Sequence, residues 1–288
     1  MKPSYLAPLT LEEALEHLNR RGETVRVLAG GTDLMVEIRA ARLKGNTVPP
    51  ALLDVSAIPE LREIRMEAGH LHLGAAVTFH TLEHDPLIKK MVPVLSAAAA
   101  QMGSVQVRRL ATIGGNVGTA SPAGDGITPL TALDAEVKVV SRDKSRVLPL
   151  TDLITGPGRT GLAANELIHS FSLAFPAAPE RCFFSKIMRR RAVAIARMNL
   201  AVQIRLVDSG MIQSSRIAAG AVFPTPRRLM EVEGLLIGQL PGKELFQACG
   251  RRAVEAMRVV SGRRPSMAYK EPALERLVVQ GLEQTCGV

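Results

Sequence analysis

The sequence predicts an α+β protein in which a two-part, mixed α/β region precedes a C-terminal α+β domain with a small antiparallel sheet and helices. Three observations predict this class. Helical and strand patterns alternate over residues 10–173, and a proline-rich segment at 175–179 (FPAAP) has the composition of a linker. Beyond this segment, three strand candidates precede three helical stretches.

The size and composition are those of an ordinary globular protein. The chain has 288 residues, of which 47% are hydrophobic and 22% charged. The apolar run at 92–100 is far shorter than the roughly 20 residues that a membrane-spanning helix needs. Glu12, Glu13 and Glu16 lie where a secretory signal would be apolar. We therefore expect a cytoplasmic protein without a membrane span.

The first elements are a helix, a strand and a tight turn. Thr10 and Glu13 form a capping box before a helical pattern that stops at Gly22. The β-branched run at 24–28 predicts a strand that enters a glycine turn, and a helical pattern begins at Leu34. The breaks and strands that follow, in order, are Pro49-Pro50, a strand at 52–55, and a hairpin of 62–66 with 71–73.

The middle of the chain is helical before it returns to strands. Helices are expected through residues 80–90 and 92–102. The segment that follows, which holds glycines at 114, 115, 118, 124 and 126, would be a poor helix or strand. After it we expect a helix at 127–133, and strands at 135–140, 147–150 and 166–173.

The last third of the chain predicts an antiparallel sheet with helices. Strands are expected at 183–188, 200–206 and 215–222, with a turn at 208–210. Helices are expected at 228–237, 244–259 and 272–283, the last beginning at Pro272.

The net charge of +9 is concentrated in one segment. Residues 181–230 hold ten basic residues and one acid, Asp208. A positive face of this kind suits nucleic acid, an anionic cofactor or an acidic partner, and it also suits a solvated rim. The chain has no Trp, two Tyr and seven Phe, few for a protein that stacks nucleic-acid bases.

Several common catalytic and metal-binding patterns are absent. There is no GxSxG elbow, P-loop or kinase signature. Cys182, Cys249 and Cys286 lie too far apart for metal-ligand spacing and disfavour a disulfide framework. His80 and His84 are four residues apart, but such a pair on a surface helix is usually solvated, so we expect no metal site. The single GxGxxG, at 156–161, precedes a strand rather than a helix. We therefore predict a glycine-rich loop there and not a dinucleotide-binding turn.

Two other glycine segments are placed to bind a ligand. The heptapeptide LAGGTDL at 28–34 lies between a strand and a helix, where backbone N–H groups and a helix dipole can face a phosphate. Thr32 adds a hydroxyl donor, and Asp33 could cap the helix. A tight turn without a ligand would carry the same residues.

The second segment is ATIGGN at 111–116, followed by SPAGD at 121–125. Gly114 and Gly115 would again expose backbone donors, and Asp125 suits ribose or ribityl hydroxyls. Two such loops, about eighty residues apart, predict one dinucleotide held from both sides.

These motifs in this order resemble the FAD-binding subunit of the molybdenum hydroxylases, the xanthine dehydrogenase family. The resemblance runs from TLEEAL at 10–15 to RPSMAYKEPALERLV at 264–278. It implies a flavin-binding region of the vanillyl-alcohol-oxidase (PCMH) type in two subdomains, 1–55 and 56–177. It also implies a C-terminal domain, 178–288, of the carbon monoxide dehydrogenase flavoprotein type.

The resemblance also implies cofactor-binding residues. The first loop would hold the FAD pyrophosphate, the second would clasp its other side, Asp125 would contact the sugar part, and Leu167 and Lys186 would lie near the flavin. The loop residues are Arg26, Val27, Leu28, Ala29, Gly30, Gly31, Thr32 and Asp33, and Ala111, Thr112, Ile113, Gly114, Gly115 and Asn116.

The implied function is electron transfer. Electrons would pass from a 2Fe-2S small subunit, reduced by a molybdenum-cofactor large subunit, through FAD to NAD, oxygen or another acceptor. No catalytic side chain is expected, because flavin carries the redox chemistry. Three other readings are a free-standing FAD oxidoreductase, a flavin-free scaffold of the same fold and a basic nucleic-acid-binding protein; the last would leave the two glycine loops unexplained.

Overall fold

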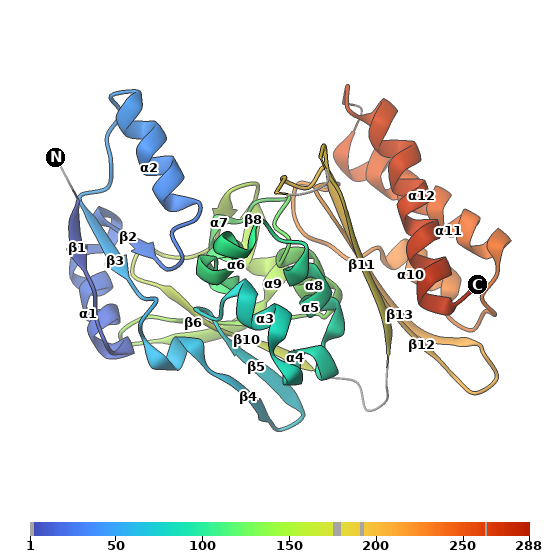
Figure 1. Ribbon diagram of the computed structural model, residues 1–288, viewed down its shortest axis with the longest axis horizontal. Helices are drawn as coiled ribbons and strands as arrows, with labels where there is room; N and C mark the ends of the chain where they lie inside the picture. The colour runs from blue at the N-terminus through green and yellow to red at the C-terminus, as the bar shows by residue number, and fades with distance from the viewer. Residues whose placement is uncertain (1–2, 175–179, 191–192, 263) are drawn as a thin grey trace.

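The structure is a computed structural model that describes residues 3–174, 180–190, 193–262 and 264–288. Along the chain, a three-stranded, a five-stranded and a second three-stranded sheet follow one another, with helices packed against them (Figure 1). The mixture of helices and strands confirms the predicted fold class. The expected linker at 175–179 lies outside the described residues.

The N-terminal sheet is parallel, in the order β1-β3-β2. Its elements are β1 (Ser4–Leu6), α1 (Leu11–Arg21), the short 3-10 helix η1 (Gly22–Thr24), β2 (Val25–Leu28), α2 (Leu34–Leu43) and β3 (Ala51–Asp54). The predicted N-cap is present, since Thr10 Oγ1 accepts from the N–H of Glu13 at 3.2 Å. Strand β1 was not predicted, because its three residues are strand-like only through their pairing with β3.

The middle sheet is antiparallel, in the order β4-β5-β10-β6-β7. Its strands are β4 (Ile64–Glu67), β5 (His70–Gly74), β6 (Glu136–Val140), β7 (Ser145–Pro149) and β10 (Leu167–Ala174), with η2 (Pro59–Arg62) before β4. The central strand, β10, comes last in the chain. A bulge at His169 shifts its register, so that Ile168 joins the core cluster of Phe171 and Leu173, whereas Leu167 packs in the cluster of the N-terminal sheet.

A group of short helices covers this sheet. They are α3 (Phe79–His84), α4 (Pro86–Met91), α5 (Pro93–Ala100), α6 (Val105–Leu110), α7 (Ile113–Thr119), α8 (Ile127–Ala132) and α9 (Leu150–Leu153), followed by the hairpin of β8 (Ile154–Gly156) and β9 (Arg159–Thr160). The single helix expected at 80–90 is two helices. Asp85, which precedes Pro86, is extended and caps α4 through the N–H groups of Leu87 and Ile88.

Helix α7 contradicts the prediction that the segment with glycines from 114 to 126 would be a poor helix. Its sequence, IGGNVGT, has low helix propensity, but Thr112 caps it by accepting from the N–H of Gly115. Gly114 packs so closely that an added Cβ would lie 2.6 Å from the Cβ of Ala75. Tertiary packing that only glycine permits therefore outweighs the propensity.

The C-terminal sheet is antiparallel, in the order β11-β12-β13. Its elements are β11 (Arg181–Ile187), β12 (Met198–Leu206), β13 (Ile212–Gly220), α10 (Met230–Leu236), α11 (Lys243–Ser261) and α12 (Met267–Cys286). Strand β12 is buried along most of its length, because α12 packs on the sheet from one side and α5 and α8 from the other.

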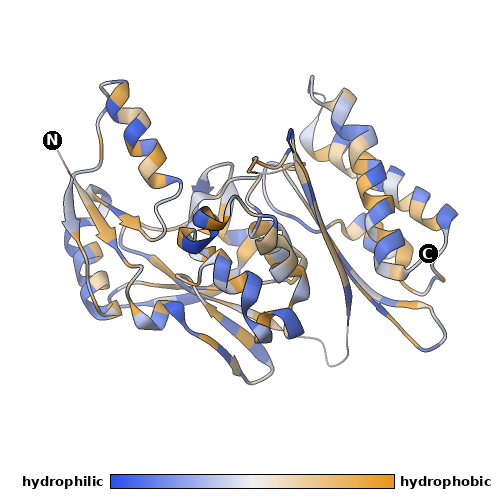
Figure 2. Ribbon diagram, in the orientation of Figure 1, coloured by the Kyte–Doolittle hydropathy of each residue, from blue (hydrophilic) through white to orange (hydrophobic). Residues whose placement is uncertain are grey.

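Hydrophobic and hydrophilic residues alternate along α11 and α12, as expected for helices that bury one face (Figure 2). Helix α12 begins five residues before the predicted start at Pro272, which lies inside it. Among the helices in the described part of the chain, none combines the length and apolar character that a membrane crossing requires.

Candidate functional site

A cavity of about 540 Å³ opens between the N-terminal sheet and the helices of the middle region. Its walls come from the β2–α2 loop, the start of α7 and the segment that leads into β10. This volume is in the range of small-molecule and cofactor sites. The two glycine loops singled out in the sequence therefore face one cavity.

Most of the predicted site residues line this cavity. Those that do are Arg26, Val27, Ala29, Gly30, Gly31, Thr32, Asp33, Ala111, Thr112, Gly114, Gly115, Asn116 and Leu167. Leu28 and Ile113 do not line it: Leu28 is the last residue of β2, and Ile113 is buried in the core. Asp125 and Lys186 lie apart from the lining, in a buried contact with each other.

The two loops touch through their backbones. A Cβ added to Gly30 would lie 2.0 Å from the carbonyl oxygen of Leu110 and 2.9 Å from the Cα of Ala111. Because neither of these is a movable side chain, only glycine allows the first loop to approach the second. This contact brings residues about eighty positions apart in the chain to one edge of the cavity.

The first loop presents free donors. Within the described residues, the backbone N–H groups of Gly30, Gly31 and Thr32 donate to no protein acceptor. Gly31 adopts the left-handed conformation, with φ of +67°, which turns the chain into α2. Unpaired N–H groups beside a cavity and before a helix suit an anionic group such as a pyrophosphate.

Asp33 has a different role from the one expected. It occupies the N-cap position of α2 but makes no side-chain capping bond. Its carboxylate instead accepts from Thr119 Oγ1 at 3.0 Å. Asp33 thus ties the start of α2 to the end of α7, the two helices that flank the cavity.

The second loop does not expose its glycine donors, contrary to the prediction. The N–H of Ile113 donates to Val77 O at 2.9 Å, that of Gly114 to Ala75 O at 2.8 Å, and that of Gly115 to Thr112 Oγ1 at 3.0 Å. The first two bonds fix the loop against the segment that follows β5, and the third caps α7. The second glycine pair therefore shapes the cavity by close packing.

A third wall of the cavity was not predicted from the sequence. Gly158, Leu162, Ala163, Ala164 and Glu166 line the cavity from the segment before β10. The GxGxxG motif is a β-hairpin of β8 and β9, as expected for a motif that is not a Rossmann turn, yet its central glycine reaches the cavity. No local pattern marks this wall, because it depends on β10 lying between β5 and β6.

An ion pair holds the third wall in place. Arg146 of β7 donates to both carboxylate oxygens of Glu166, at 2.9 and 2.7 Å, and to Gly161 O at 2.8 Å. Glu166 also accepts from the N–H of Ala163 at 2.9 Å. The hydrogen bond from Arg146 lowers the pKa of Glu166 below its usual value. We call this arrangement the Arg146–Glu166 clamp.

Arg146→Met is expected to weaken FAD binding about tenfold, which corresponds to about 1.4 kcal/mol. The turn at 161–166 would lose its clamp, although no cavity contact would be removed directly. Flavin fluorescence titration measures the change. Arg65→Met is a matched control, since Arg65 is also exposed on this sheet and paired with carboxylates, but its partners Glu63 and Glu67, unlike Glu166, do not line the cavity. Equal effects in the two variants would contradict a role for the clamp.

Asp125 and Lys186 form a buried polar network. Lys186 Nζ on β11 lies 2.5 Å from Asp125 Oδ2, and Asn199 Nδ2 on β12 donates to Asp125 Oδ1 at 3.3 Å. Thr128 on α8 donates to Asn199 Oδ1 at 2.7 Å. Burial raises the pKa of Asp125, and Lys186 opposes this rise. The network joins the middle region to the C-terminal sheet; the role of this pair at the cofactor stays a prediction.

The basic segment at 181–230 is partly neutralised by the fold. Lys186 pairs with Asp125, Arg227 with Glu231, and Arg228 with Asp134 and Glu233. All of these acidic partners lie outside residues 181–230, so the neutralisation depends on the fold. Arg189 is exposed, and Arg191 lies outside the described residues.

A cavity bordered by glycine loops and free N–H donors, in a mixed α/β fold, defines a protein that binds a large anionic ligand. The sequence profile described as "FAD binding domain in molybdopterin dehydrogenase" matches residues 1–176, and that of the "CO dehydrogenase flavoprotein C-terminal domain" matches residues 183–285. The chain belongs to this family of FAD-binding subunits of molybdenum hydroxylases.

Individual relatives agree with the family. The nicotinate dehydrogenase FAD-subunit of Eubacterium barkeri is 33% identical, over 98% of this chain and 97% of the relative. A putative xanthine dehydrogenase FAD-binding subunit of Escherichia coli is 32% identical, over 80% of this chain and 77% of the length of that subunit. A solved carbon monoxide dehydrogenase from Hydrogenophaga pseudoflava superposes with a TM-score of 0.91 at 26% identity, covering 100% of this chain and 98% of that one.

The predicted cofactor and enzyme class are thereby confirmed. FAD is the cofactor of this family, and the chain is an oxidoreductase subunit. The cavity fits such a ligand, since Gly30, Gly31 and Thr32, whose N–H groups are free, line it. Apolar side chains, including Val27, Val55 and Leu167, line other parts of it.

Proposed function

We propose that this chain transfers electrons within a multi-subunit molybdenum hydroxylase. Electrons would arrive from a 2Fe-2S small subunit, which is reduced by a molybdenum-cofactor large subunit, and leave for NAD, oxygen or another acceptor. The named relatives support this proposal, since they are subunits of nicotinate, xanthine and carbon monoxide dehydrogenases. Bound FAD would supply the redox chemistry, because it accepts and releases electrons one or two at a time.

The residues of this chain would bind and shield the cofactor. The N–H groups of Gly30, Gly31 and Thr32 would donate to the pyrophosphate, and this loop is the observation that carries the proposal. Leu167 and the other apolar lining would exclude water from the bound ligand. The Arg146–Glu166 clamp would hold the third wall against it. We further propose that the subdomains are residues 1–55 and 56–177, with the C-terminal domain at 178–288.

Adding FAD to flavin-stripped protein is expected to raise the melting temperature. A ligand at about a hundred times its dissociation constant stabilises the folded state by roughly 2.7 kcal/mol, or about 5 °C for a chain of this size. Differential scanning fluorimetry with FAD, and with FMN as control, measures the shift. A smaller shift with FMN is expected, since FMN lacks the adenylate half. No shift with FAD would instead support a flavin-free scaffold.

The electron-transfer step needs a separate experiment. Mixing the FAD-loaded chain with a reduced 2Fe-2S small subunit, co-expressed from the same source, should bleach the flavin absorption near 450 nm in the manner general to reduced flavins. Flavin that is reduced by a small organic substrate alone, without partner subunits, would favour a free-standing FAD oxidoreductase.

A further inference from the structure

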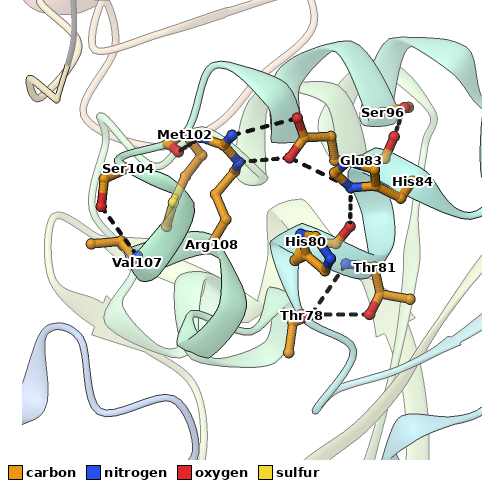
Figure 3. A network of polar contacts seen from close by, with 10 residues as sticks. All are labelled: Thr78, His80, Thr81, Glu83, His84, Ser96, Met102, Ser104, Val107 and Arg108. Carbon is orange, nitrogen blue, oxygen red and sulfur yellow. Dashed lines mark hydrogen bonds and ion pairs between the residues drawn. The ribbon is translucent and has the colours of Figure 1, made fainter.

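Three side chains that could ligate a metal gather on α3, outside the cavity. His80, Glu83 and His84 lie at positions i, i+3 and i+4 of one helix, and therefore on one face (Figure 3). One nitrogen or oxygen atom from each of them lies within 4.8 Å of the other two. The imidazole rings are 4.3 Å apart between centroids.

The two imidazoles are prepared for a ligand in different ways. His84 Nδ1 lies 2.9 Å from His80 O, so this nitrogen donates to the carbonyl. In a neutral ring, such a bond leaves Nε2 with its lone pair free, as in many metal-binding histidines. His80 Nδ1 is buried without a hydrogen-bond partner. A buried nitrogen without a partner is costly, and bonding to a ligand would remove that cost.

The carboxylate is held close to the rings by a third element. Arg108 on α6 donates to Glu83 through Nε, at 2.6 Å from Oε2, and more weakly through Nη2, at 3.4 Å from Oε1. Both side chains are mostly buried, with 12% of Arg108 and 19% of Glu83 exposed. Oε1 has only the long contact and can therefore turn toward a cation while Oε2 remains with Arg108.

We propose that His80, Glu83 and His84 bind one divalent transition-metal ion such as Zn²⁺. Two imidazole nitrogens and one carboxylate oxygen are a ligand set that Zn²⁺ takes in proteins, with water completing the coordination. One nitrogen or oxygen atom of each side chain already lies within 4.8 Å of the other two, and rotation of the side chains would bring the ligand atoms to bonds of about 2.0–2.2 Å. The spacing of His80 and His84 had suggested a solvated pair; Glu83 and the buried nitrogen change that interpretation.

The site is independent of the proposed flavin function, so its test needs no cofactor. The full chain, stripped with EDTA, is titrated with ZnCl₂ by isothermal titration calorimetry. We expect one Zn²⁺ per chain and at least tenfold weaker binding in each of His80→Gln and His84→Gln. Because His84 is exposed, His84→Gln should keep the wild-type melting temperature, so that its effect reports on ligation and not on folding.

A second histidine pair is the matched control. His70 and His72 have ring centroids 6.4 Å apart, and Glu67 lies 4.0 Å from His72 Nε2. His70→Gln should leave the affinity for Zn²⁺ unchanged. The proposal would be overturned if no Zn²⁺ bound at about 100 μM. It would also be overturned if His70→Gln and His84→Gln lost equal affinity.

Discussion

Gly31→Asp is expected to lower the affinity for FAD at least 100-fold, or about 2.7 kcal/mol, while the chain stays folded. The new carboxylate would lie among the free N–H groups that we assign to the pyrophosphate. It would compete for these donors and repel the phosphates, and like charges placed together cost several kcal/mol. Flavin content after purification, and titration of stripped protein with FAD, measure the loss.

Gly45→Asp separates the effect of charge from that of backbone strain. Gly45 has φ of +70°, nearly the value of +67° at Gly31, and nothing lies within 4 Å of an added Cβ. Both variants therefore carry a similar backbone cost, about 1 kcal/mol for a left-handed residue. Of these two glycines, Gly31 lines the cavity and Gly45 does not. Wild-type flavin occupancy in Gly31→Asp would refute the assignment of the first loop.

Lys186→Met is expected to destabilise the folded chain by about 3–5 kcal/mol at neutral pH, since it leaves the carboxylate of Asp125 buried without its cation. The side chains of Lys186 and Asp125 are only 2% and 8% exposed, so water cannot replace the lost partner. Urea unfolding of the FAD-free protein measures the loss. The exposed Lys138→Met should change stability by less than about 0.5 kcal/mol.

The loss should depend on pH in a defined direction. Burial already raises the pKa of Asp125, and removing Lys186 would raise it further. The folded variant then binds a proton that the unfolded chain releases, so its stability deficit shrinks as the pH falls through the raised pKa. Lys186→Met combined with Asp125→Asn should recover most of the loss. A double variant as unstable as the single one would show that the charge pair is not the cause.

Local patterns in the sequence were sufficient for several features of the fold and site. The capping box of Thr10 and Glu13 predicted α1, and the β-branched run before Gly30 predicted the strand–turn–helix that forms the first loop. In these cases the interactions that stabilise an element lie within a few residues of it. The motif combination also identified the family and its cofactor, which the profile matches confirm.

Other features depend on residues far apart in the chain. Helix α7 forms across three glycines because Gly114 packs on Ala75. The donors of Gly114 and Gly115, expected to be free, are used by this packing. Helix propensity describes the preference of residues in an isolated segment and does not include such tertiary contacts.

Sequence patterns alone were enough to predict the fold class, the first glycine loop and the family of FAD-binding subunits. The pairing of the charges and the closing of the cavity, in contrast, depend on contacts between distant segments. Arg228 is paired with Asp134 from the middle region, and the third wall exists because β10, late in the chain, lies between β5 and β6. The difference comes from the separation along the chain of the residues that interact. Capping and hydrophobic periodicity involve residues a few positions apart, whereas ion pairs and cavity walls join segments that only the folded sheets bring together.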